Sequence, residues 1–216
     1  MKPKKETGKP GAFTPWAKGL CLVFASLLFW FSLSCGGEES SGDLIRTAEE
    51  LCLKSAAVNE MLYGEMPVKE DGEKAGVYRE IDPDALRAFG VSSCLQMTAA
   101  MREVYADKVC LWMVSTLFSP IYADNLLVSA AKFYDNEEGT LFVNAGAAPL
   151  LLGKNTYSDF VLLSRKRDTV TFSCTVSVTY EGKTQTEENA VFTMVKEKNG
   201  YRLAEPTYKS YTISEE

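Results

Sequence analysis

The strongest constraint on the fold is a strict two-residue alternation of apolar and hydroxyl-bearing side chains between residues 169 and 180. The apolar members are Val170, Phe172, Cys174, Val176, Val178 and Tyr180. Successive side chains of a β-strand point to opposite faces of its sheet. The pattern therefore predicts a strand of an antiparallel sheet, with one face buried and with threonine and serine hydroxyls on the other face.

The rest of the second half also divides into short strands separated by turn residues. Turns are predicted at Asn136–Gly139, Glu181–Gly182 and Asn199–Gly200, because glycine and asparagine readily adopt the backbone angles of tight turns. The strands predicted around these turns are 132–135, 140–144, 160–163, 169–180, 190–195 and a last strand that begins at 201–203.

The first half shows the helical spacing of apolar residues instead. The predicted helices are residues 43–64, a short piece from 83 to about 90, residues 93–106 and residues 108–118. Asp82, Ser92 or Ser93, and Asp107 are expected to cap helices, and Leu95 is expected on an inward face. Helices followed by an antiparallel meander predict an α+β fold, in which one layer of helices packs on one curved sheet.

A separate constraint comes from the N-terminus, where residues 19–37 carry no charge and residues 20–33 are mostly apolar. Lysines precede this run, and Glu38 and Glu39 follow it. Since lysines stay on the cytoplasmic side of a membrane, the run predicts a hydrophobic signal or anchor helix that leaves the rest of the chain outside the cytoplasm. A cleaved signal peptide, an uncleaved anchor and a lipoprotein signal all fit this pattern.

The end of the hydrophobic run favours the lipoprotein signal. Ser32-Leu33-Ser34-Cys35-Gly36 resembles a bacterial lipobox, with Ser32 in the place where leucine is usual. Cys35 is therefore the predicted lipidation site, and the alternative is a thiol at the end of a membrane helix. The expected division is a signal peptide or anchor over 1–35, a flexible tether over 36–42, the folded domain over 43–210 and a tail over 211–216. The predicted location is the extracytoplasmic face of the cell membrane, with a lipid anchor or a single N-terminal transmembrane helix.

The charge balance and the absence of histidine exclude several functions. The chain has 23 basic residues, 29 acidic residues and no histidine. Five lysines and one acidic residue precede Cys35, so the exported part has a net charge of −10, and nucleic acid is excluded as a partner. Without histidine, Ser-His-Asp and Cys-His catalysis are impossible, whereas carboxylate, tyrosine and lysine chemistry stays open.

Four cysteines lie beyond the lipobox, namely Cys52, Cys94, Cys110 and Cys174. Outside the cytoplasm, an even number permits two disulfides in three pairings. Because Cys52, Cys110 and Cys174 lie on apolar stripes, buried free thiols are the favoured alternative. The sequence has no CxxC motif, so nothing in it favours redox or zinc chemistry.

Two stretches of the second half resemble known proteins. The ending from Phe192 to Leu203, with its Lys-Glu-Lys-Asn-Gly turn, resembles the last hairpin of NTF2-like (cystatin-like) rolls. The stretch from Tyr122 to Val143, which includes Phe133-Tyr134-Asp135, is similar to exported bacterial proteins related to the DL-endopeptidase inhibitor IseA family. The resemblance implies a concave sheet that faces helices, with a pocket or a covered core between them. Enzymes, ligand binders and protein-binding modules all occur in this fold.

Three polar segments are candidate sites. Asp82, beside Tyr78 and Glu80, could be a general base in a pocket, but an N-cap is the favoured interpretation. The acids of 135–139 have a spacing that hints at calcium, although a solvated hairpin turn explains them. The hydroxyl face of residues 169–179 could bind a glycan or a peptide, and ordinary strand propensity explains it equally well.

The uncharged connection 145–153 is the favoured interaction surface. It is apolar where loops are usually polar. It either closes the end of the fold as part of the core, or presents Leu150, Leu151 and Leu152 to a partner or a pocket.

These observations predict a membrane-tethered, extracytoplasmic, non-catalytic binding module without metal or cofactor. Its expected partner is an envelope protein or a cell-wall component, and control of a cell-wall hydrolase is a specific version. The alternative is a small-ligand-binding protein or an enzyme that uses carboxylate or tyrosine chemistry in the cavity. A deep pocket with converging acids or tyrosines would favour the alternative, and a filled cavity would favour the module.

Overall fold

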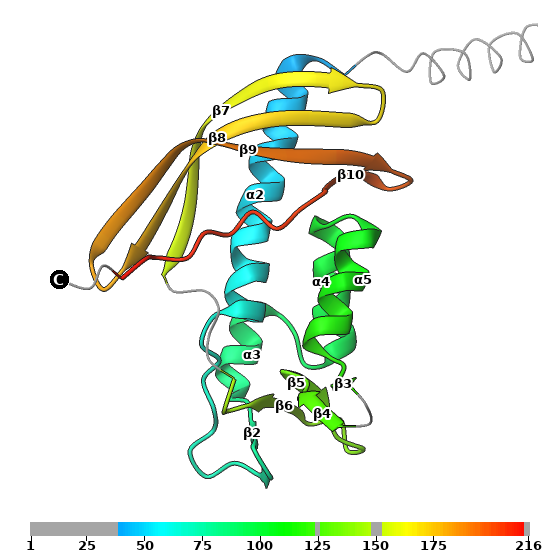
Figure 1. The fold of residues 1–216 in the computed structure, drawn as a ribbon, viewed down its shortest axis with the longest axis vertical. Coiled ribbons are helices and arrows are strands. Elements are labelled where there is room, and N and C mark those ends of the chain that lie inside the picture. Colours follow the sequence, from blue (N-terminus) through cyan, green and yellow to red (C-terminus); the bar gives the residue numbers. More distant parts are fainter. Residues whose placement is uncertain (1–38, 124–125, 148–152, 214–216) are drawn as a thin grey trace, which may run out of the picture. The chain divides into compact units, whose positions relative to one another are not determined.

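The chain has the predicted α+β organisation, with helices in the first half and antiparallel strands in the second half (Figure 1). The computed structural model describes residues 39–123, 126–147 and 153–213, and those from Ser40 onward belong to one compact unit. Its helices are α2 (Ser41–Tyr63), α3 (Pro83–Phe89), α4 (Cys94–Val104) and α5 (Asp107–Leu117). No helix among these residues is both long enough and apolar enough to cross a membrane, and the predicted signal segment 1–35 lies outside the described residues.

The larger sheet has four antiparallel strands in the order β10–β9–β8–β7. Its strands are β7 (Lys154–Lys166), β8 (Thr169–Tyr180), β9 (Lys183–Glu197) and β10 (Gly200–Leu203). The alternation predicted for β8 is confirmed, because its apolar residues from Val170 to Val178 are buried. β7 and β9 are much longer than predicted, since their outer ends carry polar side chains on both faces and an alternation of apolar residues does not reveal them.

A second antiparallel sheet has the strand order β1–β2–β6–β5. Its strands are β1 (Lys74–Ala75), β2 (Tyr78–Glu80), β5 (Phe133–Asp135) and β6 (Leu141–Asn144), and β3 (Ile121–Ala123) pairs with β4 (Leu126–Ser129) separately. The predicted hairpin is therefore confirmed as β5 and β6. The prediction of a single sheet is wrong, because β6 pairs with β2 rather than with the larger sheet.

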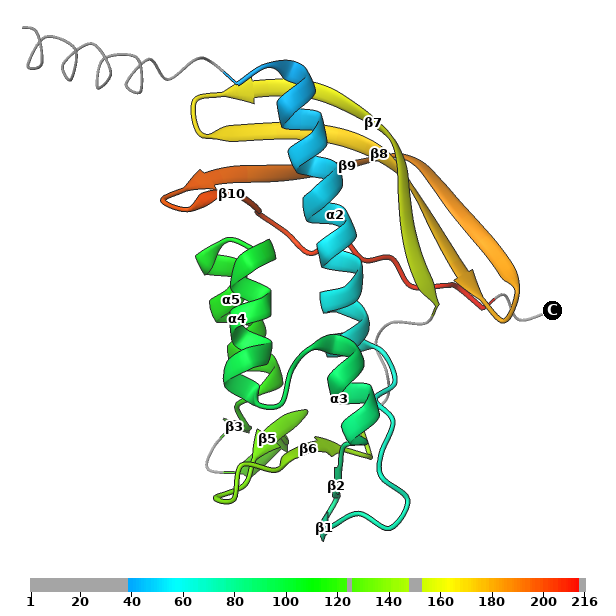
Figure 2. The ribbon, with the colours of Figure 1, turned by 180° about the vertical axis from the view of Figure 1, so that it is seen from behind.

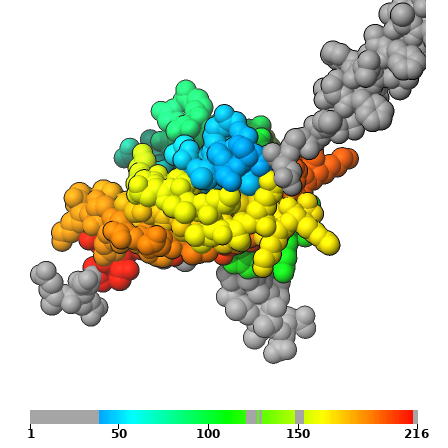
Figure 3. Space-filling view, turned by 90° about the horizontal axis from the view of Figure 1, so that it is seen from above, coloured from blue at the N-terminus to red at the C-terminus, as the bar shows by residue number. Residues whose placement is uncertain are grey.

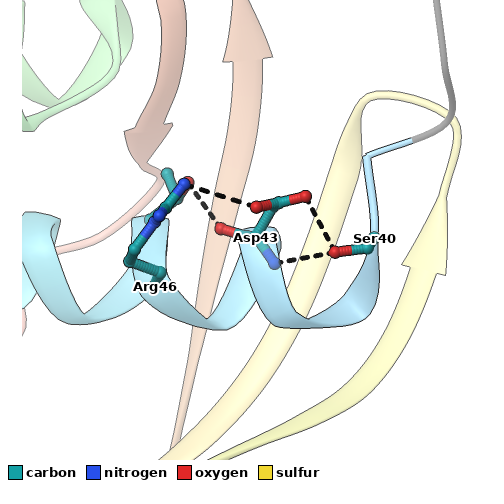
Figure 4. A network of polar contacts seen from close by, with 4 residues as sticks. Ser40, Asp43 and Arg46 are labelled. Atoms are coloured by element: carbon teal, nitrogen blue, oxygen red, sulfur yellow. Dashed lines mark hydrogen bonds and ion pairs between the residues drawn. The ribbon is translucent and has the colours of Figure 1, made fainter.

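Helix α2 starts with a hydrogen-bonded N-cap (Figure 4). The Asp43 backbone N–H donates to Ser40 Oγ over 3.1 Å, and Ser40 Oγ donates to the Asp43 carboxylate over 2.8 Å. The Ser40 hydroxyl, and more weakly the Arg46 guanidinium, lower the pKa of the Asp43 carboxyl. The negative charge near the helix N-terminus also suits the helix dipole. The helix ends at the predicted Gly64, whose N–H donates to Glu60 O.

Helix α2 lies across one face of the larger sheet, and α4 and α5 extend the helical layer (Figures 1 and 2). Its buried face follows the predicted helical spacing and joins one hydrophobic core with the apolar face of the sheet. The core residues from α2 include Leu44, Ala48, Leu51, Cys52, Val58, Met61 and Leu62; those from β8 include Val170, Phe172, Cys174 and Val176. Side chains therefore fill the space between helix and sheet.

The shorter helices confirm two predicted caps and correct two other predictions. Asp82 caps α3, and Ser93 caps α4. Leu95 is 77% exposed, because it precedes the buried Met97 by two positions, which is roughly 200° around a helix. Asp107 is the first residue of α5 rather than its cap, and its N–H donates to the Glu197 carboxylate over 3.0 Å.

Candidate functional site

The predicted site residues fall into two groups. Cys35 and Leu150–Leu152 lie outside the described residues, so those predictions remain predictions. Asp82 is the N-cap of α3, since its carboxylate accepts from the Asp84 N–H over 2.7 Å. The Asp135 carboxylate accepts from the N–H of Cys94 at the start of α4, and it therefore helps to cap that helix.

The acidic turn after Asp135 is closed by the side chain of Asn136. Asn136 Oδ1 accepts from the N–H groups of Glu138 and Thr140 over 3.1 and 2.8 Å. Among the described residues no group of three or more acidic or cysteine side chains is placed to hold a metal ion. The turn is therefore assigned a structural role.

The hydroxyl face of β8 is present as predicted, but two of its hydroxyls pair with threonine hydroxyls of β9. Ser177 Oγ lies 3.1 Å from Thr186 Oγ1, and Thr179 Oγ1 lies 2.9 Å from Thr184 Oγ1. These are cross-strand pairs between β8 and β9, which stabilise a sheet without any ligand.

An open groove between α2 and β7 is the best candidate for a binding site. Its cavity measures about 330 Å³. The residues that line it are Leu53, Ala56, Ala57 and Glu60 of α2, then Gly153, and Lys154, Asn155, Thr156 and Tyr157 of β7. Leu53 is 64% exposed, so it presents apolar surface at the groove. Figure 3 shows α2 and β7 side by side at the surface.

The sequence explains why this groove stays open. Residues 53, 56, 57 and 60 lie on one stripe of a helix, and the two alanines of that stripe fill little space. Gly153 borders the strand side with φ +91°, and a Cβ there would lie 2.8 Å from Thr179 O, so only glycine allows this close approach. β7 is also the edge strand of its sheet. Sequence reasoning missed the groove, although Leu53 lies off the buried face of α2 and could have marked it.

A buried polar network lies behind the groove and fixes the C-terminal segment. Ser55 Oγ lies 2.6 Å from Thr207 Oγ1, and Tyr157 OH lies 3.2 Å from the same atom. Burial raises the pKa of the Tyr157 hydroxyl, so it stays protonated at neutral pH. Asn155 holds the backbone of Lys209 with two hydrogen bonds of 2.8 and 2.7 Å. These polar groups therefore serve the fold.

Two further buried polar side chains, Asn59 and Tyr63, lie on α2. Tyr105 OH donates to Asn59 Oδ1 over 2.8 Å. Asn59 Nδ2 and Tyr63 OH, by contrast, have no hydrogen-bond partner among the described residues. Burial raises the pKa of Tyr63 and of Tyr105 above the usual range for tyrosine, which keeps both hydroxyls neutral.

A second cavity, of about 220 Å³, is lined by Lys132 together with Gly64, Glu65, Met66 and other residues. Lys132 is buried, and its Nζ donates to Leu62 O over 2.7 Å and to Gly64 O over 3.2 Å. Burial lowers the pKa of the Lys132 amine to about 8. The lysine therefore acts as a cap for the C-terminal carbonyls of α2, a position that suits a cation.

A third cavity, of about 320 Å³, lies between the larger sheet and the C-terminal segment. Each of the three cavities has one carboxylate among its lining residues, namely Glu60, Glu65 or Glu187. A pair of carboxylates that could divide acid and base roles is therefore not found in any of them.

Comparisons with known proteins give no match, either to protein-family models or to curated proteins. The function is therefore argued from the groove and its surroundings.

Proposed function

We propose that this chain is a membrane-tethered, extracytoplasmic, non-catalytic binding module, and that the groove between α2 and β7 binds an extended segment of an envelope protein. The observation that carries the proposal is an open, largely apolar groove beside a sheet edge, over a core that is already filled. The groove borders a sheet edge, so it offers a surface to an extended segment of a larger partner.

The edge strand provides the means of recognition. The backbone groups on the outer side of an edge strand can pair with an added strand, which gives affinity, while pockets for alternate side chains give specificity. Here Leu53 and Ala57 would contact apolar side chains of the added segment. Glu60 and Lys154, of opposite charge, lie at the two walls of the groove and would orient its polar groups.

The resemblance to the NTF2-like fold and to the IseA inhibitor family supports a specific version of the proposal. In that version the partner is a cell-wall hydrolase, and the tethered domain modulates its activity at the membrane. The predicted export signal around Cys35 and the lack of histidine agree with a module of this kind. The apolar segment Leu150–Leu152, which directly precedes Gly153 in the sequence, remains a predicted contact for the same partner.

The proposal is tested by affinity capture with the full-length chain in detergent. The bait is incubated with an envelope extract of the producing organism, and the captured proteins are identified by mass spectrometry. Leu53→Asp tests the groove, and Leu111→Asp is its matched control, since Leu111 of α5 is 66% exposed and does not line the groove. Leu150→Asp tests the apolar segment.

We expect one envelope protein to be enriched by the wild type and by Leu111→Asp, and to be lost with Leu53→Asp. Equal capture by both variants would refute the groove as the binding surface. Retention of a glycan by the folded domain, in place of a protein, would change the partner class to a cell-wall component.

The second candidate function is a small-ligand site or an enzyme at the Lys132 cavity. It is favoured by one observation, a buried amine whose pKa of about 8 makes it partly neutral near physiological pH. Such an amine could attack a carbonyl group. Incubation with a small aldehyde and borohydride, followed by peptide mass spectrometry, would show labelling at Lys132 well above that at Lys108 of α5. Equal labelling of the two lysines would exclude this function.

A further inference from the structure

Two cysteine side chains meet in the core where α2 packs on β8. Cys52 lies on the buried face of α2 and Cys174 lies on the buried face of β8, with exposed fractions of 0% and 1%. Each thiol acts on the pKa of the other, so the two side chains are neighbours, and both are free thiols in the structure. They belong to the same hydrophobic cluster. The two residues are 122 positions apart in the sequence, so only the packing of the helix on the sheet brings them together.

The other described cysteines have different partners. Cys110 Sγ lies 3.3 Å from Tyr105 O, toward which its thiol points. Cys94, at the start of α4, lies beside the Asp135 carboxylate. Burial, and then the neighbouring carboxylate, raise the pKa of the Cys94 thiol to about 12, so this thiol stays protonated at neutral pH.

We propose that Cys52 and Cys174 form a disulfide that joins α2 to β8, and that Cys94 and Cys110 remain thiols. Of the three pairings that the four cysteines allow, this is the one that joins neighbouring side chains of the core, because the Cys110 thiol points toward Tyr105 O and Cys94 lies beside Asp135. The proposal rests on the described core and is independent of the proposed binding function.

The bond forms by thiol–disulfide exchange with a small or protein-borne disulfide as the oxidant. A thiolate of one cysteine attacks the oxidant R–S–S–R and releases one RS⁻. The second cysteine, as its thiolate, then attacks the mixed disulfide and releases the other RS⁻. The two cysteines are oxidised, the oxidant is reduced to two thiols, and the two protons pass to the leaving thiolates.

The position of the bond has a consequence for stability. A disulfide restricts the unfolded chain more strongly when it closes a longer loop, and this one closes most of the domain. For a chain of this size we expect reduction to lower the melting temperature by about 10 °C. Because both sulfurs are buried, reduction of the folded protein should be slow and should require opening of the contact between α2 and β8.

The test uses the full-length chain in detergent, unfolded in urea and refolded in a glutathione redox buffer. Free thiols are then blocked with iodoacetamide under denaturing conditions, and the unreduced protein is digested with trypsin. We expect one cross-linked species made of Thr47–Lys54 and Asp168–Lys183. The peptides Ala88–Arg102 and Val109–Lys132, which contain Cys94 and Cys110, should be fully alkylated.

Two variants complete the design. Cys52→Ala should lose the cross-linked species and the effect of reduction on the melting temperature, whereas Cys110→Ala should retain both. Alkylation of Cys52 and Cys174 in the refolded wild type, glutathione adducts at either position, or a cross-link to Cys94 or Cys110 would each overturn the proposal.

Discussion

The buried amine of Lys132 gives the sharpest prediction about stability. Its pKa is about 8 in the folded protein, against an ordinary value of 10.5, because burial disfavours the charged form. Between these two pH values the unfolded chain keeps the proton and the folded chain releases it. Stability therefore rises with pH in this window. Below pH 8 both states are protonated and the full burial penalty is present; above pH 10.5 both are neutral and it vanishes.

The size of the effect follows from the two pKa values. One pKa unit corresponds to about 1.4 kcal/mol, so the contribution of Lys132 to the free energy of unfolding should increase by about 3 kcal/mol between pH 7.5 and 10.5. Lys132→Met has a side chain of similar length without the amine, and its stability should lack this component. The difference in the free energy of unfolding between wild type and Lys132→Met cancels the contributions of other groups that titrate in the same pH range.

The measurement is a series of urea titrations of both proteins from pH 6 to pH 10.5, followed by far-UV circular dichroism and extrapolated to water. Lys108→Met, at an exposed position of α5, controls for the loss of one lysine. We expect the free-energy difference between wild type and Lys132→Met to move in favour of the wild type as the pH rises. A difference that stays constant within about 1 kcal/mol across this range would refute the burial argument, which predicts a change of about 3 kcal/mol.

Two further predictions concern the sheet beside the groove. Asn155→Ala removes both hydrogen bonds to the Lys209 backbone, so it should destabilise the fold by about 2–3 kcal/mol and speed amide hydrogen exchange around residue 209; unchanged exchange there would contradict the role given to Asn155. Gly153→Ala should destabilise the fold by about 3 kcal/mol, because it combines a positive φ with a Cβ that lies 2.8 Å from Thr179 O. Gly76→Ala is its control, since φ is +64° there and no atom lies within 4 Å of the added Cβ. This control should cost about 1 kcal/mol. Equal losses in the two glycine variants, measured by urea unfolding, would exclude the close approach as the cause.

Local patterns predicted the elements whose stability comes from one buried face. The alternation of β8 and the helical stripe of α2 both predicted their buried residues, because the period of the apolar side chains matches the period of the element. The hairpin of β5 and β6 was predicted from its turn, which Asn136 closes with its side chain. In each case the signal lies within about twenty residues of sequence.

Features that depend on distant pairing could not be predicted in the same way. β2 is a three-residue strand that pairs locally with the two-residue β1 and also with β6, more than 60 residues later. The groove exists because α2 packs beside β7, and neither segment marks it alone. Lys132 was predicted to begin a strand. Its burial comes from packing against the C-terminal carbonyls of α2, and residues 132–135 alone give no sign of that distant contact. These features depend on contacts between segments that are far apart in the sequence, and the local pattern of a single sequence does not predict such contacts.

The position of α2 also constrains how the protein can fold. This helix contacts the larger sheet as well as α3 and α4, yet β7 and β8 follow it by about one hundred residues. Contacts of such long sequence separation slow folding, because a large loop must close before they form. The apolar face of α2 therefore stays uncovered until nearly the whole chain has emerged. Folding of this domain should be a late, concerted event that a chain truncated before β8 cannot begin.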